Sequence, residues 1–214
     1  MAHLLLDIET VPGTVLSDDE LLESIAAPGN YKDPAKIAAY KADKMDDARR
    51  KQALSGGLGE CVSIAWTWDD GPVTCEWRKQ GESESDLLQA VTQSWRQTVD
   101  HDLGPVNFVV FNGEFDLKFI WQRLKVLQIP VPTWWPRPLD IKPWSNNIID
   151  VMHQWGGKDK VSQRNLCRYL SIPYDDTIDG SGVWDAWKGQ RYDEIAQHNI
   201  ADVVRLHQIW RRLE

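Results

Sequence analysis

Short apolar runs alternate with longer amphipathic stretches along this chain of 214 residues. The apolar runs have the length of strands and predict strands at 3–9, 61–68, 73–79 and 106–111, with a fifth near 147–151. Helical spacing of apolar positions predicts helices at 34–52, 83–99, 115–127, 162–170 and 192–213. Three strands followed by alternating helices and strands are typical of an α/β protein with a mixed five-stranded sheet flanked by helices.

The length predicts a single domain over residues 1–214, large enough for a substantial core. A charged stretch at about 28–59 separates the first two predicted strands and predicts a helical insertion between them. Asp33 and Pro34 favour a helix start there, as a cap and a first-turn proline. The insertion could be a lid over a substrate or only a solvated helix.

Two acids lie on the first predicted strand, in the sequence DIET. Because side chains alternate along a strand, Asp7 and Glu9 project to the same face. Adjacent carboxylates repel each other unless a cation lies between them, and hard oxygen ligands suit Mg²⁺ or Mn²⁺ rather than Zn²⁺. On its own the pair is a weak signal, since two such acids also occur in solvated turns at strand ends.

Two predicted helices carry further candidates. Asn112 and Gly113 end the strand at 106–111, so Asp116 falls in the first turn of the next helix, at a sheet edge where α/β sites collect. The alternative for Asp116 is an acid that only complements the helix dipole. In the last helix, His198 and Asp202 are four residues apart and share a face. The alternative there is an exposed acid beside a surface histidine.

Together these segments resemble the DEDD superfamily of 3′–5′ exonucleases, and most closely its stand-alone, phage-type members related to the proofreading domain of family B DNA polymerases. Matches to the three family motifs are Asp7 with Glu9, then Asn112, Phe115 and Asp116, and finally Asp202. The resemblance covers nearly the whole chain and implies a ribonuclease H-like fold. One position departs from it. His198 has the spacing to Asp202 of the tyrosine subgroup, whereas Gln197 occupies the position of the histidine subgroup.

The resemblance implies a metal-dependent 3′–5′ exonuclease that uses two Mg²⁺ or Mn²⁺ ions. The implied metal ligands are Asp7, Glu9, Asp116 and Asp202, with His198 as the general base and Thr10, Asn112 and Phe115 against the terminal nucleotide. The implied partner is nucleic acid with a free 3′ end, with single-stranded DNA favoured over RNA. The implied product is a nucleoside 5′-monophosphate. Two alternatives stay open: a catalytically weak nucleic-acid-binding relative, and an endonuclease of the same fold.

The net charge of −8 argues against tight, non-specific binding of duplexes but not against a site for a 3′ end. Basic residues still gather locally, as at Lys158, Lys160 and Arg164. Among twelve tryptophans, Trp134 and Trp135 lie in a proline-rich loop and are the best candidates for stacking on bases. The alternative for both is a place in the core.

Cellular location is suggested by three features of the sequence. No apolar stretch reaches the length of a transmembrane span, and the N-terminal run lacks the basic region of a signal peptide. The three cysteines lack metal-binding spacing and cannot all pair. We therefore expect a cytoplasmic protein, in the host cytoplasm if it is phage-encoded. The sequence leaves the oligomeric state open.

Overall fold

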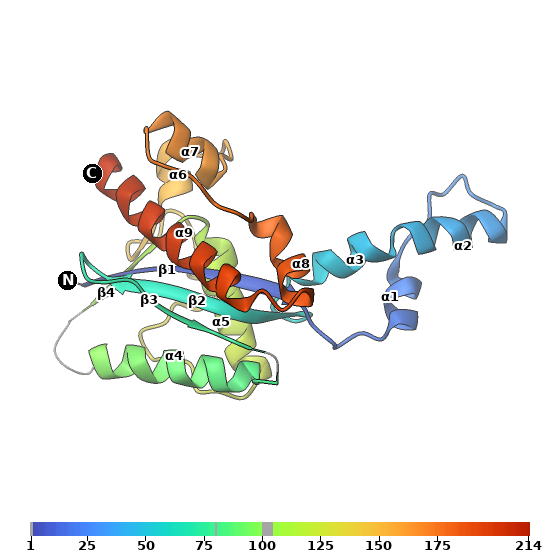
Figure 1. Cartoon of the computed structure of the whole chain (residues 1–214), viewed down its shortest axis with the longest axis horizontal. Coiled ribbons are helices and arrows are strands. Elements are labelled where there is room, and N and C mark those ends of the chain that lie inside the picture. The colour runs from blue at the N-terminus through green and yellow to red at the C-terminus, as the bar shows by residue number, and fades with distance from the viewer. Residues whose placement is uncertain (1, 80, 100–104) are drawn as a thin grey trace.

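The computed structural model describes residues 2–79, 81–99 and 105–214 (Figure 1). Its five strands are β1 (Ala2–Pro12), β2 (Gly59–Trp68), β3 (Thr74–Trp77), β4 (Val106–Val110) and β5 (Ile148–Asp150). They form one sheet in the order β3-β2-β1-β4-β5. The pairs β1–β2 and β2–β3 are antiparallel, and the pairs β1–β4 and β4–β5 are parallel. The predicted mixed five-stranded sheet is confirmed, with β1 at its centre.

Helices cover both faces of the sheet (Figure 1). On one face lie α4 (Glu84–Val99) and α5 (Gly113–Val126). On the other lie α6 (Val151–Gly156), α7 (Gln163–Tyr169) and α9 (Tyr192–Leu213). A 3₁₀ turn at Gly180–Gly182 leads into α8 (Val183–Lys188), which packs against the start of α9. Helices α6 and α8 were not predicted, because each has six residues, too few to show a helical period.

The alternation of side chains along β1 determines what each face of the sheet carries. Leu4, Leu6 and Ile8 enter the core shared with α4 and α5. Leu5 enters the core shared with α9. Asp7 and Glu9 follow Leu5 at every second position, so they share one face, as predicted, and the structure shows that this is the face covered by α9.

Between β1 and β2 the chain forms three helices, α1 (Asp18–Ser24), α2 (Pro34–Asp43) and α3 (Met45–Gln52). We refer to residues 13–58 as the arm. Figure 1 shows the arm extending beyond one end of the sheet, with α2 farthest out, and α2 has no buried residue. The helix predicted at 34–52 is two helices, because the chain turns at Lys44, whose amide donates to the carbonyls of Tyr40 and Ala42. The sequence analysis also missed α1.

Among the described residues, no helix combines the length and the apolar character that crossing a membrane requires.

Candidate active site

A pocket of about 1040 Å³ opens where β1, α5 and α9 meet. Its lining includes all five residues predicted to do the chemistry, Asp7, Glu9, Asp116, His198 and Asp202. Thr10, Asn112 and Phe115 line it as well. Further walls come from the end of α3, the start of α7 and the turn before α8. The structure therefore brings together segments that lie far apart in the sequence.

Asp116 reaches this pocket because β4 passes directly into α5. The carbonyl of Asn112 accepts hydrogen bonds from the amides of Phe115 and Asp116, at 2.8 and 3.4 Å, and so forms the first turn of the helix. The amide of Gly113 donates to Asp150 at the end of β5, at 3.1 Å. Gly113 lies so close to β4 that a Cβ atom would be 2.7 Å from Cγ2 of Val110. This close approach places the side chain of Asp116 beside β1.

Burial and mutual repulsion raise the pKa values of the four carboxylates. Desolvation raises the pKa of Asp7 well above its usual range, and the charges of Asp202, Asp116 and Glu9 add to the effect. Desolvation likewise raises the pKa of Glu9, followed by the charges of Asp202 and Asp116. For Asp116, burial and the neighbouring Asp150 raise the pKa to about 8.

Opposing effects act on the pKa of Asp202. Burial raises its pKa, but His198 and Arg205 oppose that shift by stabilising the carboxylate. When ionised, the four carboxylates would carry more buried negative charge than the neighbouring cations offset. A divalent cation would relieve this repulsion.

His198 lies between the pocket and Asp176, an acid that was not predicted to belong to the site. Its Nε2 is 3.3 Å from Oε1 of Glu9 and 3.6 Å from Oδ2 of Asp202. Its Nδ1 is 3.0 Å from Oδ2 of Asp176. The carboxylate of Asp176 also accepts two hydrogen bonds from the guanidinium of Arg205, at 2.7 and 2.6 Å. The side chains of His198, Asp176 and Arg205 are about 95% buried, so this arrangement is fixed by its surroundings.

Asn199 is a second residue that the sequence analysis missed. Its Nδ2 donates to Oδ2 of Asp7 at 2.7 Å, and its Oδ1 accepts from the hydroxyl of Ser63 at 2.8 Å. It is fully buried in the apolar stripe of α9, between Ile195 and Val203. A polar residue at such a stripe position was a usable signal. Asp176 lies in an irregular segment, where the sequence shows no comparable signal.

The predicted substrate residues fall into two groups. Thr10, Asn112 and Phe115 line the pocket, and the hydroxyl of Thr10 donates to the carbonyl of Ala53 at 2.7 Å, which ties β1 to the base of the arm.

Neither Trp134 nor Trp135 lines the pocket, and the burial of Trp135 contradicts the prediction that it stacks on bases, whereas Trp134 is partly exposed. Trp135 is 4% exposed and stacks on Trp95, with ring centroids 5.1 Å apart. Trp134 is stacked on Phe108 at 5.9 Å. Both rings complete the core on the α4 side of the sheet, because apolar burial there outweighs exposure in the loop.

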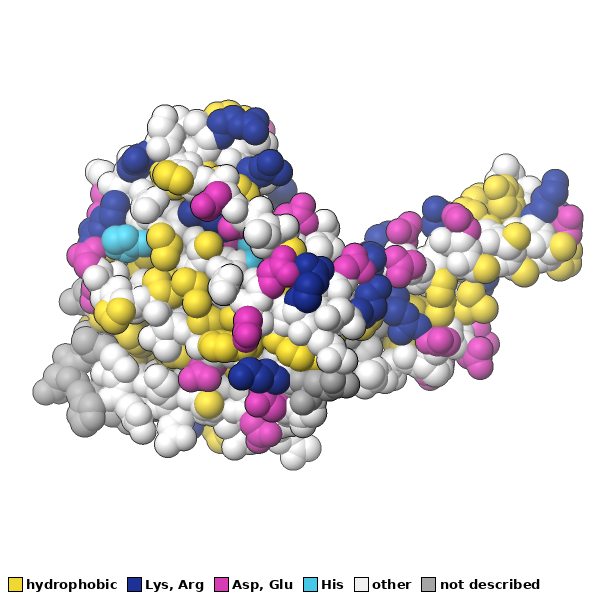
Figure 2. Space-filling model, in the orientation of Figure 1, with side chains coloured by type: hydrophobic (Ala, Val, Ile, Leu, Met, Phe, Trp, Pro, Cys, Tyr) yellow, Lys and Arg dark blue, Asp and Glu magenta, His cyan; other side chains and the backbone are white. Residues whose placement is uncertain are grey.

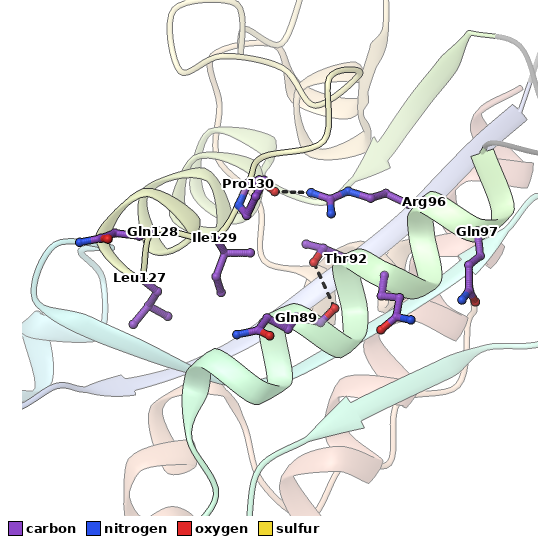
Figure 3. Close-up of a pocket in the computed structure, with 9 residues that line it drawn as sticks. Gln89, Thr92, Arg96, Gln97, Leu127, Gln128, Ile129 and Pro130 are labelled. Carbon is purple, nitrogen blue, oxygen red and sulfur yellow. Dashed lines mark hydrogen bonds between the residues drawn. The ribbon is translucent and has the colours of Figure 1, made fainter.

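A second hollow, of about 620 Å³, lies between α4 and the end of α5 (Figure 3). Glutamine side chains dominate its polar lining, and the guanidinium of Arg96 there donates to the carbonyl of Pro130. Among the described residues that line it, none carries a carboxylate. Of these two hollows, only the pocket at β1 offers ligands for a metal.

The donor set of that pocket suits a hard divalent cation. The carboxylates of Glu9 and Asp202 lie beside Nε2 of His198, and polar atoms of these three side chains all lie within 4.8 Å of one another. Asp7 and Asp116 add carboxylates to the same pocket. Oxygen-rich sites of this kind favour Mg²⁺ and Mn²⁺.

Comparison with known proteins places this geometry in a family. The model of a family described as "Predicted 3'-5' exonuclease related to the exonuclease domain of PolB" matches residues 60–214, which include Asp116, His198 and Asp202. The match begins after β1, so Asp7 and Glu9 lie outside the matched residues. The folded structure places them in the same pocket as Asp116, His198 and Asp202. A search of curated proteins found no match.

Among solved structures, the chain is similar to the family B DNA polymerase from the hyperthermophilic archaeon Pyrobaculum calidifontis, with a TM-score of 0.59 and 15% sequence identity. The similarity covers 99% of this chain and 24% of the polymerase chain, so this chain spans about a quarter of the polymerase's length. At that identity the likeness establishes a shared fold, the ribonuclease H-like fold of the exonuclease domain. The family match over most of the chain shows that it belongs to the family of predicted 3′–5′ exonucleases related to the exonuclease domain of PolB.

Proposed function

We propose that the protein is a metal-dependent 3′–5′ exonuclease that hydrolyses nucleic acid, with single-stranded DNA as the favoured substrate, to nucleoside 5′-monophosphates. One observation carries the proposal. Four carboxylates, from β1, α5 and α9, converge in one pocket of a chain that belongs to this family. We further propose that residues 1–214 act as a single exonuclease domain, with the arm as an insertion.

Charge balance favours two divalent cations in the pocket. When ionised, Asp7, Glu9, Asp116 and Asp202 carry four negative charges, and the single positive charge of Arg205, which is shared between Asp176 and Asp202, offsets the charge of Asp176. Two divalent cations would balance the four. Bound there, Mg²⁺ or Mn²⁺ would neutralise the scissile phosphate, help to ionise the attacking water and stabilise the leaving oxygen.

His198 is the proposed general base. A proton on Nδ1 that is donated to Asp176 leaves the lone pair of Nε2 facing the pocket, where it can take a proton from water. Both ring nitrogens face carboxylates, and the tautomer with the proton on Nδ1 is the one that the proposed role requires. Asp176 is a positioning residue, because it holds the ring and Arg205 in turn holds Asp176. The arrangement explains how a histidine works at the spacing of the tyrosine subgroup.

Thr10, Asn112 and Phe115 form the part of the pocket wall that we assign to the terminal nucleotide. Phe115 is partly exposed and offers an aromatic ring to a base or sugar. Asn112 offers an amide to the 3′ hydroxyl.

Cleavage of end-labelled oligonucleotides tests the proposal directly. DNA and RNA, single- and double-stranded, are incubated with Mg²⁺ or Mn²⁺, and the products are resolved by length. We expect stepwise shortening from a free 3′ hydroxyl, release of mononucleotides, and strong inhibition by a 3′ phosphate. Cleavage of a closed single-stranded circle would favour the endonuclease. Binding of oligonucleotides with no turnover under any metal would favour the weak relative.

A further inference from the structure

Two aromatic rings form a stacked pair on the surface of α6 and α7. Trp155, near the end of α6, and Tyr169, the last residue of α7, have ring centroids 6.1 Å apart and planes 23° apart. They are 44% and 59% exposed, respectively. Exposed rings that stack only on each other leave their outer faces open to a further flat group.

Basic residues lie between these two rings in the sequence. The segment 151–172 contains Lys158, Lys160, Arg164 and Arg168, all exposed, and a single acid, Asp159, in a chain whose net charge is −8. Within the ranges that the structure describes, Lys158, Lys160 and Arg168 form no ion pair with an acid. Figure 2 shows Lys and Arg side chains gathered over α7. The local charge is therefore opposite to that of the molecule as a whole.

The same segment reaches the catalytic pocket. Ser162, Gln163 and Arg164, at the start of α7, line that pocket. The guanidinium of Arg164 lies 5.6 Å from the ring centroid of Tyr174, another lining residue. From Arg164 to Tyr169 the helix rises by roughly 8 Å, at 1.5 Å per residue. Arg164 and Arg168 share a face of α7, so a chain that leaves the pocket past Arg164 would meet Arg168 and then the adjacent Tyr169.

We propose that these residues, the α6–α7 surface (Trp155, Lys158, Lys160, Arg164, Arg168 and Tyr169), bind the single-stranded nucleic acid that lies 5′ to the nucleotides held in the pocket. The inference rests on the proposed function. Phosphates complement the cations, and unpaired bases stack on the exposed rings. Duplex bases are already stacked on each other, so an aromatic pair selects single strands. This surface would compensate for the acidic character of the rest of the chain.

Binding measurements on a catalytically silent background test the surface. In an Asp7→Asn protein without metal, Trp155→Ala with Tyr169→Ala should weaken binding of single strands of about 4–16 nucleotides by roughly 5- to 150-fold, the equivalent of 1–3 kcal/mol of stacking. Lys158→Ala with Lys160→Ala should flatten the dependence of log K on log salt by about 1.4, because each phosphate neutralised on a single strand contributes about 0.7 to that slope. The matched control is Lys79→Ala with Lys125→Ala, which removes two exposed charges outside this surface.

Activity separates this inference from the proposed function. With Asp7 restored, the variants should cleave a dinucleotide at the wild-type rate but lose kcat/KM on long single strands. If the wild type cleaves no substrate while the binding losses occur, the proposed function fails and the surface stands. If the wild type cleaves but both surface variants bind long strands like the control, the surface is not used. Equal binding of duplex and single strands, insensitive to the aromatic pair, would also overturn the inference. Unchanged melting temperatures would verify that the exposed substitutions leave the fold intact.

Discussion

At the scale of single residues, we expect each carboxylate of the proposed metal site to destabilise the metal-free fold and to stabilise the metal-bound one. Burial and like charges disfavour ionised Asp7. We expect Asp7→Asn to abolish cleavage and to leave the melting temperature in EDTA unchanged or higher. Cations stabilise a folded protein by mass action, by about 2.7 kcal/mol at one hundred times the dissociation constant, and the variant should lose most of that gain. Thermal melts with and without Mn²⁺ measure both effects.

The control for that experiment is Asp175→Asn, which makes the same Asp-to-Asn substitution at an exposed position. It should keep the response to Mn²⁺ and the activity of the wild type. Substantial turnover by Asp7→Asn would contradict the assignment of β1 as the source of the metal ligands.

The pair His198 and Asp176 gives a second residue-scale prediction. His198→Ala should lower kcat by about 10²–10⁴-fold, the usual contribution of a general base, with little change in metal affinity. Asp176→Asn keeps the volume but removes the charge that holds both His198 and Arg205. It should lower kcat, but it should destabilise the fold by less than the roughly 3–5 kcal/mol of a fully broken buried pair, because Arg205 keeps its bonds to Asp202 and Gln163.

Combining the two substitutions distinguishes positioning from independent roles. If Asp176 acts through His198, adding Asp176→Asn to His198→Ala should cost little further activity. His198→Tyr should keep partial activity with its pH dependence moved upward, since an unperturbed tyrosine has a pKa of about 10. Wild-type kcat in both single variants would show that these side chains only pack beside the site.

How far the site could be predicted from the sequence depended on the kind of signal each residue gave. Asp7, Glu9, Asp116 and Asp202 stand in short motifs whose spacing carries meaning, and the structure places them in one pocket. Asp176 carries no motif, because its role exists only once the chain folds back against α9. A tryptophan's preference for the core or for a base depends on what covers it, and no local pattern encodes that.

At the scale of elements, the passage from β4 to α5 sets the position of Asp116. Gly113→Ala would bring a Cβ to 2.7 Å from Val110 and to 3.4 Å from Ile148, in a buried joint. We expect a loss of about 1–3 kcal/mol in the free energy of unfolding, the usual cost of overpacking, together with weaker Mn²⁺ binding as Asp116 shifts. Urea denaturation and calorimetric titration measure the two.

Gly180→Ala is the matched control, since a Cβ there would meet nothing within 4 Å. It should change the free energy of unfolding and the free energy of Mn²⁺ binding by no more than a few tenths of a kcal/mol. Equal stability of the Gly113 and Gly180 variants would show that the joint can relax around a methyl group.

Elements were predictable in proportion to their length and regularity. The long helices α4, α5 and α9 have strong periodic patterns, and the strands were predicted from short apolar runs. The break between α2 and α3 does not, because residues on both sides of Lys44 favour a helix and only the turn at Lys44 separates them. The short helix α1 depends on a capping box in which Ser17 and Glu20 bond each other's backbone amides, a local signal that was present but not used.

At the scale of the whole molecule, the site makes stability depend on pH. Asp7, Glu9, Asp116 and Asp202 have raised pKa values in the folded, metal-free protein, about 8 for Asp116. In the unfolded chain, such groups titrate near 4. The folded state therefore holds more protons than the unfolded state, and the stability contributed below about pH 4 is lost as pH rises through about 8. In EDTA, the free energy of unfolding should fall between pH 5 and 9.

Mn²⁺ should reduce that fall, because the cation binds the ionised carboxylates. Asp116→Asn should flatten the profile in EDTA, and denaturant titrations at several pH values compare the two proteins. A metal-free profile that rises up to pH 9 would show that the four acids do not share a desolvated site.

The central place of β1 has a consequence for hydrogen exchange. β1 is hydrogen-bonded to β2 on one side and to β4 on the other, and Leu4, Leu5 and Leu6 are fully buried. Amides on such a strand exchange with solvent only when much of the molecule opens, whereas α2, with no buried residue, can open by itself. Deuterium should therefore enter α2 first and β1 last, with or without metal. Asp7 and Glu9 then keep their spacing through every local fluctuation, and a cation can leave and return without any part of the sheet refolding.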